Sequence, residues 1–215
     1  EEEIGARYAE GKMRCPTHLS TGQEGVPAAL AECLLPTDFA VSTHRGHAHY
    51  LAKGGNLNAM IAEIYGKVTG CSRGRGGSMH LVDLDVGFMG TSAIVGNSIP
   101  IGVGLGLAAQ HRETDQVSCI FFGDGATEEG VYYESLNFAA VRNLPVLFVC
   151  ENNLYSVYSP LEVRQPPGRC IATVASSMGL KTIKGDGNDV LAVHADCSRA
   201  IADIRAGGGP WLVEY

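Results

Sequence analysis

The stretch VSCIFFGDGATEEGVYYESLNFAAVRNLPVLFVCENNLY, residues 117–155, decides the fold. Residues 117–122 and 146–150 are apolar apart from Ser118 and have the length of strands, and residues 128–142 between them have the length of a helix. Apolar strands that alternate with helices are typical of a parallel sheet covered by helices on both faces. The stretch therefore predicts a strand, a helix and a second strand that lie side by side in such a sheet.

The segments on either side extend this pattern. Three glycines, Gly102, Gly104 and Gly106, fall inside one predicted helix, where each is unfavourable by about 1 kcal/mol, so they indicate a closely packed neighbour or ligand. A histidine-rich loop is expected after the strand predicted over 39–42. The further elements that we predict are helices at 1–12, 26–35, 57–65, 97–111, 171–178 and 189–204 and strands at 39–42, 181–184 and 211–214.

Together these elements predict an α/β fold, a doubly wound and mainly parallel sheet with helices on both faces. The length of 215 residues suits a single domain, which we assign to residues 1–215. The sequence begins without Met and closes directly after an apolar run. We therefore expect the natural polypeptide to extend beyond both ends.

Two of the predicted strands end in loops that suit a phosphate and a hard metal ion. Gly123, Asp124 and Gly125 follow the strand predicted over 117–122, and Asn152 and Asn153 follow the one predicted over 146–150. In open parallel sheets, ligands bind beyond the carboxyl ends of the strands, so the two loops should lie together. Glycines free backbone N–H groups for phosphate oxygens, and carboxylate and amide oxygens suit Mg²⁺. The pair therefore predicts a diphosphate bridged to magnesium.

Gly-Asp-Gly followed by Asn-Asn at this distance resembles the thiamine diphosphate motif. Nearly the whole chain resembles the alpha subunit of the decarboxylating component of 2-oxo acid dehydrogenases of the pyruvate and acetoin type. The stretches that carry this resemblance are THLSTGQEG, STHRGHAHYLAKGG, GRGGSMHL, GFMGTSAIVGNSIPIGVGLGLA, FFGDGATEEGVYYESLNFAAV and ENNLY. The cofactors that the resemblance implies are thiamine diphosphate and Mg²⁺.

Site residues follow from the resemblance position by position. It implies that Asp124 and Asn153 bind the metal through side chains and Tyr155 through its carbonyl oxygen. It also implies a diphosphate contact from Arg45, whose guanidinium suits bidentate binding, and a histidine, His18, at the substrate end of the site. The remaining implied contacts are Ala93 and Val95 with the aminopyrimidine ring and Gly123, Gly125 and Ala126 with the diphosphate.

The resemblance also implies partners. In the family, a beta subunit supplies the glutamate that activates the cofactor, in an alpha2-beta2 assembly, and a lipoyl-bearing acyltransferase can accept the product. His44 stands where the family often has a Tyr that contacts the diphosphate, so this second contact does not carry over. Asp124 stands where branched-chain relatives often have Glu, which favours pyruvate or acetoin as substrate. A split transketolase-like enzyme and a non-catalytic magnesium-phosphate-binding relative remain alternatives.

Composition limits which other classes of function the chain can have. A formal net charge of −7 without a run of Lys or Arg argues against a nucleic-acid or anionic-membrane partner, and no apolar stretch is long enough to span a bilayer. The seven cysteines are widely spaced and are expected to be reduced, in the cytoplasm or, in a eukaryote, the mitochondrial matrix. His44, His47 and His49 could instead form a zinc site, an alternative that lacks the usual ligand spacing.

Overall fold

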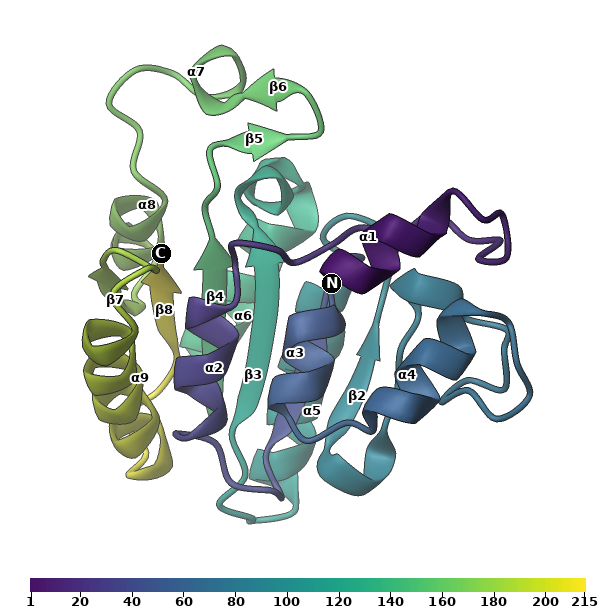
Figure 1. The fold of residues 1–215 in the computed structure, drawn as a ribbon. Coiled ribbons are helices and arrows are strands. Elements are labelled where there is room, and N and C mark those ends of the chain that lie inside the picture. Colours follow the sequence, from purple (N-terminus) through teal and green to yellow (C-terminus); the bar gives the residue numbers. More distant parts are fainter.

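Six strands form one sheet in the order β2-β1-β3-β4-β8-β7, and every neighbouring pair is parallel (Figure 1). The computed structural model describes residues 1–215. The strands are β1 Phe39–Ser42, β2 Phe88–Thr91, β3 Ser118–Gly123, β4 Val146–Glu151, β7 Lys181–Lys184 and β8 Trp211–Glu214. The predicted fold class is confirmed.

Helices cover both faces of the sheet, and each face has its own apolar core. The two central strands supply both cores because their side chains alternate: Cys119 and Phe121 belong to one core, and Ile120 and Phe122 to the other. This alternation explains why the two strands are almost entirely apolar. The helices against the first core are α1 Glu2–Tyr8, α2 Gly25–Ala31, α3 His47–Ala52, α4 Leu57–Ile64 and α9 Val190–Arg205, and those against the second are α5 Ser98–His111, α6 Gly130–Arg142 and α8 Ile171–Ser177.

Helix α5 packs unusually close to the sheet through two of its three glycines. A methyl group added at Gly102 would overlap the side chain of Ile120, and one at Gly106 would lie 2.5 Å from Val146. Nothing lies within 4 Å of the corresponding position at Gly104, which is exposed. The prediction of tight packing is therefore confirmed for Gly102 and Gly106 and wrong for Gly104.

Several predicted boundaries differ from the structure. The helix expected over 1–12 ends at Tyr8, and the one expected over 26–35 is Gly25–Ala31. Instead of a loop alone, the histidine-rich segment contains helix α3, and β2 was not predicted. Residues 124–128 form a 3-10 turn, η3, so α6 begins only at Gly130. Two other short turns, η1 Gly77–Met79 and η2 Leu84–Val86, also lie outside the predicted elements.

The segment between β4 and α8 leaves the sheet and forms a small excursion. It consists of an antiparallel hairpin, β5 Tyr155–Ser156 and β6 Ser159–Pro160, followed by the short helix α7 Leu161–Arg164. In Figure 1 this excursion projects beyond the carboxyl ends of β3 and β4. No helix in the chain has both the length and the apolar character needed to cross a membrane, and all seven cysteines are free thiols.

A buried carboxylate shapes the glycine-rich loop that follows α4. Glu63 accepts hydrogen bonds from four backbone N–H groups: Ser72 at 2.8 Å, Gly74 at 2.7 Å, Gly76 at 2.6 Å and Gly77 at 3.1 Å. The next residue, Ser78, shares a hydrogen bond of 2.7 Å with the Nε2 atom of His47 in α3. Glu63 thereby fixes the loop that supports α3.

We expect Glu63→Gln to destabilise the fold by roughly 2 kcal/mol at neutral pH, because a neutral amide cannot accept from all four N–H groups. Burial raises the pKa of Glu63, but the four N–H groups lower it more, so its pKa lies below the ordinary value of 4.5. This contribution is therefore complete above the unfolded pKa and is lost as pH falls through the lowered folded pKa. Urea unfolding should show the difference from the unmutated chain shrinking below about pH 4; a constant difference would contradict this explanation.

Candidate functional site

The winding of the chain changes direction between β1 and β3. These strands are neighbours, but the chain leaves β1 through α3 on one face and β3 through α6 on the other. Ligands of open parallel sheets bind at such a switch point, outside the carboxyl ends of the strands. On the other side of β3, Gly123 pairs with Glu151 of β4, so the segments that follow these two strands leave the sheet at the same level. The predicted loops therefore meet at the switch point.

A cavity of about 130 Å³ opens between these loops. His18 and Ala93 do not line the cavity, although both are adjacent to it. The ring of His18 packs edge-on against His44, a lining residue, with 4.6 Å between ring centroids, and Ala93 directly precedes the lining residue Ile94. Of the ten predicted site residues, the lining brings together Arg45, Val95, Gly123, Asp124, Gly125, Ala126, Asn153 and Tyr155.

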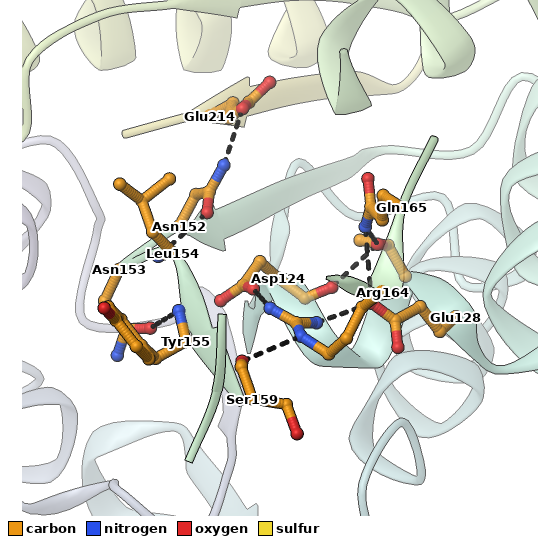
Figure 2. A network of polar contacts seen from close by, with 11 residues as sticks. Asp124, Glu128, Asn152, Asn153, Leu154, Tyr155, Ser159, Arg164, Gln165 and Glu214 are labelled. Atoms are coloured by element: carbon orange, nitrogen blue, oxygen red, sulfur yellow. Dashed lines mark hydrogen bonds and ion pairs between the residues drawn. The ribbon is translucent and has the colours of Figure 1, made fainter. Parts of the chain in front are cut away.

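Asp124 is the buried anion of the cavity, and an arginine from the excursion contacts it (Figure 2). The guanidinium of Arg164 donates through Nη2 to Asp124 Oδ2 and through Nη1 to Glu128 Oε1, the latter at 2.5 Å. Burial raises the pKa of Asp124 above its ordinary value, although Arg164 acts in the opposite direction. The carboxylate therefore lies where a cation would stabilise it most.

The two adjacent asparagines have different surroundings. The Asn152 side chain donates to Glu214 Oε1 at 2.9 Å, and Glu214 also accepts from Lys184 Nζ and from the Ala172 backbone N–H. Burial raises the pKa of Glu214, but these donors lower it more. Asn153 is exposed on the cavity, and its Oδ1 atom accepts only from the Tyr155 N–H, at 3.1 Å. Asn152 thus connects β4 to β8, and Asn153 faces the cavity.

Arg45 and His44 line the cavity, and His18 lies directly behind His44. Arg45 follows β1 and donates to the carbonyl oxygen of Leu19, which connects it to the segment that carries His18. Burial lowers the pKa of both His18 and His44, and the positive charge of Arg45 lowers both further. Both imidazoles are therefore favoured as neutral rings that can donate or accept a proton.

Comparison with known proteins agrees with this arrangement. The sequence profile of the family described as "Dehydrogenase E1 component" matches residues 1–215, the full chain. The chain belongs to this family.

Two relatives of the E1 component illustrate the similarity. The chain is 43% identical over 214 residues to the alpha subunit of acetoin:2,6-dichlorophenolindophenol oxidoreductase from Bacillus subtilis. It is 38% identical over 221 residues to the chloroplastic pyruvate dehydrogenase E1 component subunit alpha-3 from Arabidopsis thaliana. All of the chain is covered in both comparisons, but it spans only 64% and 51% of these two relatives.

A solved structure supports the fold. A protein from Mycobacterium smegmatis that was assigned as a thiamin diphosphate-dependent enzyme superposes with a TM-score of 0.54 at 18% identity. The match covers 89% of this chain and 31% of the other. At this identity the likeness supports the shared architecture alone.

The residues at the cavity fit a magnesium diphosphate. One carboxylate and one amide oxygen leave most of an octahedral shell to phosphate oxygens and water, as Mg²⁺ prefers. A methyl group added at Gly125 would lie 2.7 Å from Ser156 Oγ, so glycine is required for the close approach of this loop to β5. Arg45, which lines the same cavity, adds a positive charge.

The histidine-rich segment does not fit a zinc site. His47 and His49 lie buried in α3 rather than on a loop, and their ring nitrogens bind protein groups. His47 contacts Glu1 and Ser78, while His49 contacts Ser42 at 2.8 Å and Glu151 at 3.0 Å. No three His, Cys, Asp or Glu side chains are grouped so that they could hold a metal ion.

Sequence reasoning missed several residues of this site. Gln23 and Thr43 line the cavity without having been singled out. Glu128, the first residue of the helix predicted over 128–142, pairs with Arg164, and neither residue was singled out. No local pattern identifies Arg164, because it lies 40 residues from Asp124 in the sequence. Thr43 and Gln23 could have been noted from their positions beside Arg45 and within THLSTGQEG.

Proposed function

We propose that this chain forms the diphosphate- and Mg²⁺-binding half of a thiamine diphosphate enzyme, the alpha subunit of a 2-oxo acid or acetoin dehydrogenase. The observation that carries the proposal is the meeting of Asp124, Asn153 and Arg45 around one cavity at the switch point of the sheet. Binding at this point is the general behaviour of such sheets. The family membership of the full chain supports the same function.

The proposed roles of the residues follow from their chemistry. Asp124 and Asn153 would hold Mg²⁺ through side-chain oxygens, with the Tyr155 carbonyl oxygen as a third protein ligand. Arg45 would neutralise the diphosphate, and the backbone N–H groups of Gly123, Gly125 and Ala126 would bind its oxygens. Ala93 and Val95 would contact the aminopyrimidine ring through their backbone. His18, kept neutral by burial and by Arg45, would hold or transfer a proton at the substrate end.

When bound, thiamine diphosphate would supply carbanion stabilisation, while the protein binds and orients it. A beta subunit would contribute the activating glutamate, in an alpha2-beta2 enzyme whose cofactor lies between the two kinds of subunit. Relatives named as alpha subunits support such a partner. A lipoyl-bearing acyltransferase and a location in the cytoplasm or the mitochondrial matrix are further parts of this proposal.

The proposed substrate is pyruvate or acetoin. The relatives from B. subtilis and A. thaliana are named for acetoin and pyruvate, respectively, and the identity to the former is 43%. Both substrates place a carbonyl group beside a second oxygen-bearing carbon, so the cavity wall near His18 and His44 would meet similar polar groups. Oxidative decarboxylation of a pyruvate-like 2-oxo acid and cleavage of acetoin are the corresponding reactions.

Calorimetric titration with thiamine diphosphate tests the proposal. The protein would be titrated with and without Mg²⁺, first alone and then with the subunit encoded beside it. We expect binding that requires Mg²⁺ and becomes tighter with the partner. A folded protein that binds no thiamine diphosphate in either setting would refute the proposed function.

A further inference from the structure

The excursion between β4 and α8 returns to the cavity through a single side chain. Arg164 is the last residue of α7, and its side chain is only 10% exposed. Figure 2 shows its guanidinium between Asp124 and Glu128. Its Nε atom donates to the Ser159 carbonyl oxygen at 3.1 Å within the excursion, while both Nη atoms reach carboxylates beside β3. Arg164 therefore connects the projecting segment to the Gly-Asp-Gly loop.

The carboxylate that Arg164 contacts is the one that a metal ion would need. The Asp124 side chain is 2% exposed, and Oδ2 is engaged by the guanidinium. Mg²⁺ binds carboxylate oxygens at about 2.0–2.1 Å, so an ion on this oxygen would lie within contact distance of the Arg164 nitrogen. Two cations at that separation repel each other strongly in a buried setting. Arg164 and Mg²⁺ thus exclude each other from Asp124 Oδ2.

The excursion contains residues in unfavourable backbone conformations. Leu154 and Val157 both have left-handed backbone angles, with φ of 67° and 57°. Such angles are unfavourable for bulky side chains, above all for a β-branched valine, and persist only where other contacts impose them. Beside Arg164, the Oε1 atom of Gln165 is buried without a hydrogen-bond partner, although its Nε2 atom donates to Thr127 at 3.2 Å. Movement of the segment would relieve the unfavourable backbone angles and expose the unpaired Gln165 oxygen to water.

We infer that Arg164 is a cationic latch, which occupies Asp124 and holds helix α7 against the β3 loop until a divalent metal ion takes its place. The inference rests on the proposed metal role of Asp124. Metal loading and the position of α7 are then coupled, because the ion that binds Asp124 releases Arg164. Glu128, which Arg164 already contacts, offers the released guanidinium an anion close by.

Titration with Mn²⁺ alone tests the latch in the full-length protein with its partner subunit. Electron paramagnetic resonance of the free ion measures how much Mn²⁺ is bound. A site closed nine-tenths of the time binds about tenfold more weakly than an open one, so we expect Arg164→Gln to bind Mn²⁺ up to about tenfold more tightly. Arg169→Gln is the matched control, because Arg169 lies in the same connection but contacts Tyr133 and not Asp124. Unchanged or weaker Mn²⁺ binding by Arg164→Gln would overturn the inference.

Hydrogen exchange gives a second readout, which can be measured on the unmutated protein as well as on the variant. In the unmutated protein, saturating Mg²⁺ should accelerate exchange of the amides of Leu161 and Gln165, which bond to Leu154 and Leu161 at 2.7 Å and 2.9 Å. In Arg164→Gln these amides should exchange rapidly with or without Mg²⁺. No effect of Mg²⁺ on the unmutated protein would overturn the latch. Since neither experiment contains thiamine diphosphate, failure of the cofactor to bind would refute the proposed function and leave the latch standing.

Discussion

Replacing Asp124 with alanine is expected to weaken Mg²⁺-dependent binding of thiamine diphosphate by at least about 100-fold. Asp124 is the buried carboxylate of the Gly-Asp-Gly loop, at the junction of the switch-point loops. Loss of an anionic ligand removes both a coordinating oxygen and the charge that draws a divalent ion into a buried site. Calorimetric titration at a fixed, saturating Mg²⁺ concentration for the unmutated protein measures the change.

A matched control separates loss of the ligand from loss of the fold. Asp85→Ala also removes an aspartate, but Asp85 is exposed in η2 and does not line the cavity. We expect it to bind the cofactor as the unmutated protein does. Thermal unfolding of both variants checks that they remain folded. If Asp124→Ala is folded and binds Mg²⁺-thiamine diphosphate normally, the assignment of the metal site is wrong.

The central part of the fold could be predicted because the sequence pattern there follows from burial alone. Strands β3 and β4 contribute side chains to both cores, so nearly every position is apolar and the strands are evident. Strand β2 could not be recognised in the same way. Gly90 interrupts its four residues with a φ of 143°, and glycine is depleted in strands, so no continuous apolar run marks it.

Helix α3 was missed for a different reason. His47 and His49 look like polar loop residues, yet both are buried. Their burial depends on partners that are remote in sequence, Ser78 for His47 and Glu151 for His49, 31 and 102 residues away. A polar side chain can be buried when such partners satisfy it, and a local pattern cannot show them.

The same limit applies to the site. Adjacent strand ends in a parallel sheet bring their loops together, so Asp124 and Asn153 could be expected on one cavity from their spacing. Which of the two asparagines faces the cavity was implied only by the family resemblance, because the Glu214 partner of Asn152 is 62 residues away. Arg164 occupies a polar segment without periodicity, and only the path of the excursion brings it to Asp124.

Another buried carboxylate, Asp38, connects the amino end of β1 to the last turn of α9. Its side chain is fully buried and accepts from the backbone N–H groups of Leu35 at 2.7 Å and Val117 at 2.8 Å. Arg205 binds both of its oxygens, at 3.0 Å and 2.5 Å, and also donates to the Asp115 carbonyl oxygen at 2.6 Å. The bidentate geometry and the burial make this pair unlike an ordinary surface ion pair.

Replacing Arg205 with methionine is therefore expected to destabilise the fold by about 3 kcal/mol, because it leaves the charge of Asp38 buried without its counterion. For a domain of this size the melting temperature should fall by roughly 6–12 °C. Lys181→Met is the matched control, since its pair with Asp203 leaves the two side chains 47% and 36% exposed, and such pairs contribute little. Calorimetric melting of both variants decides the matter. Equal, small decreases would show that the two N–H groups of Leu35 and Val117 stabilise Asp38 without help from Arg205.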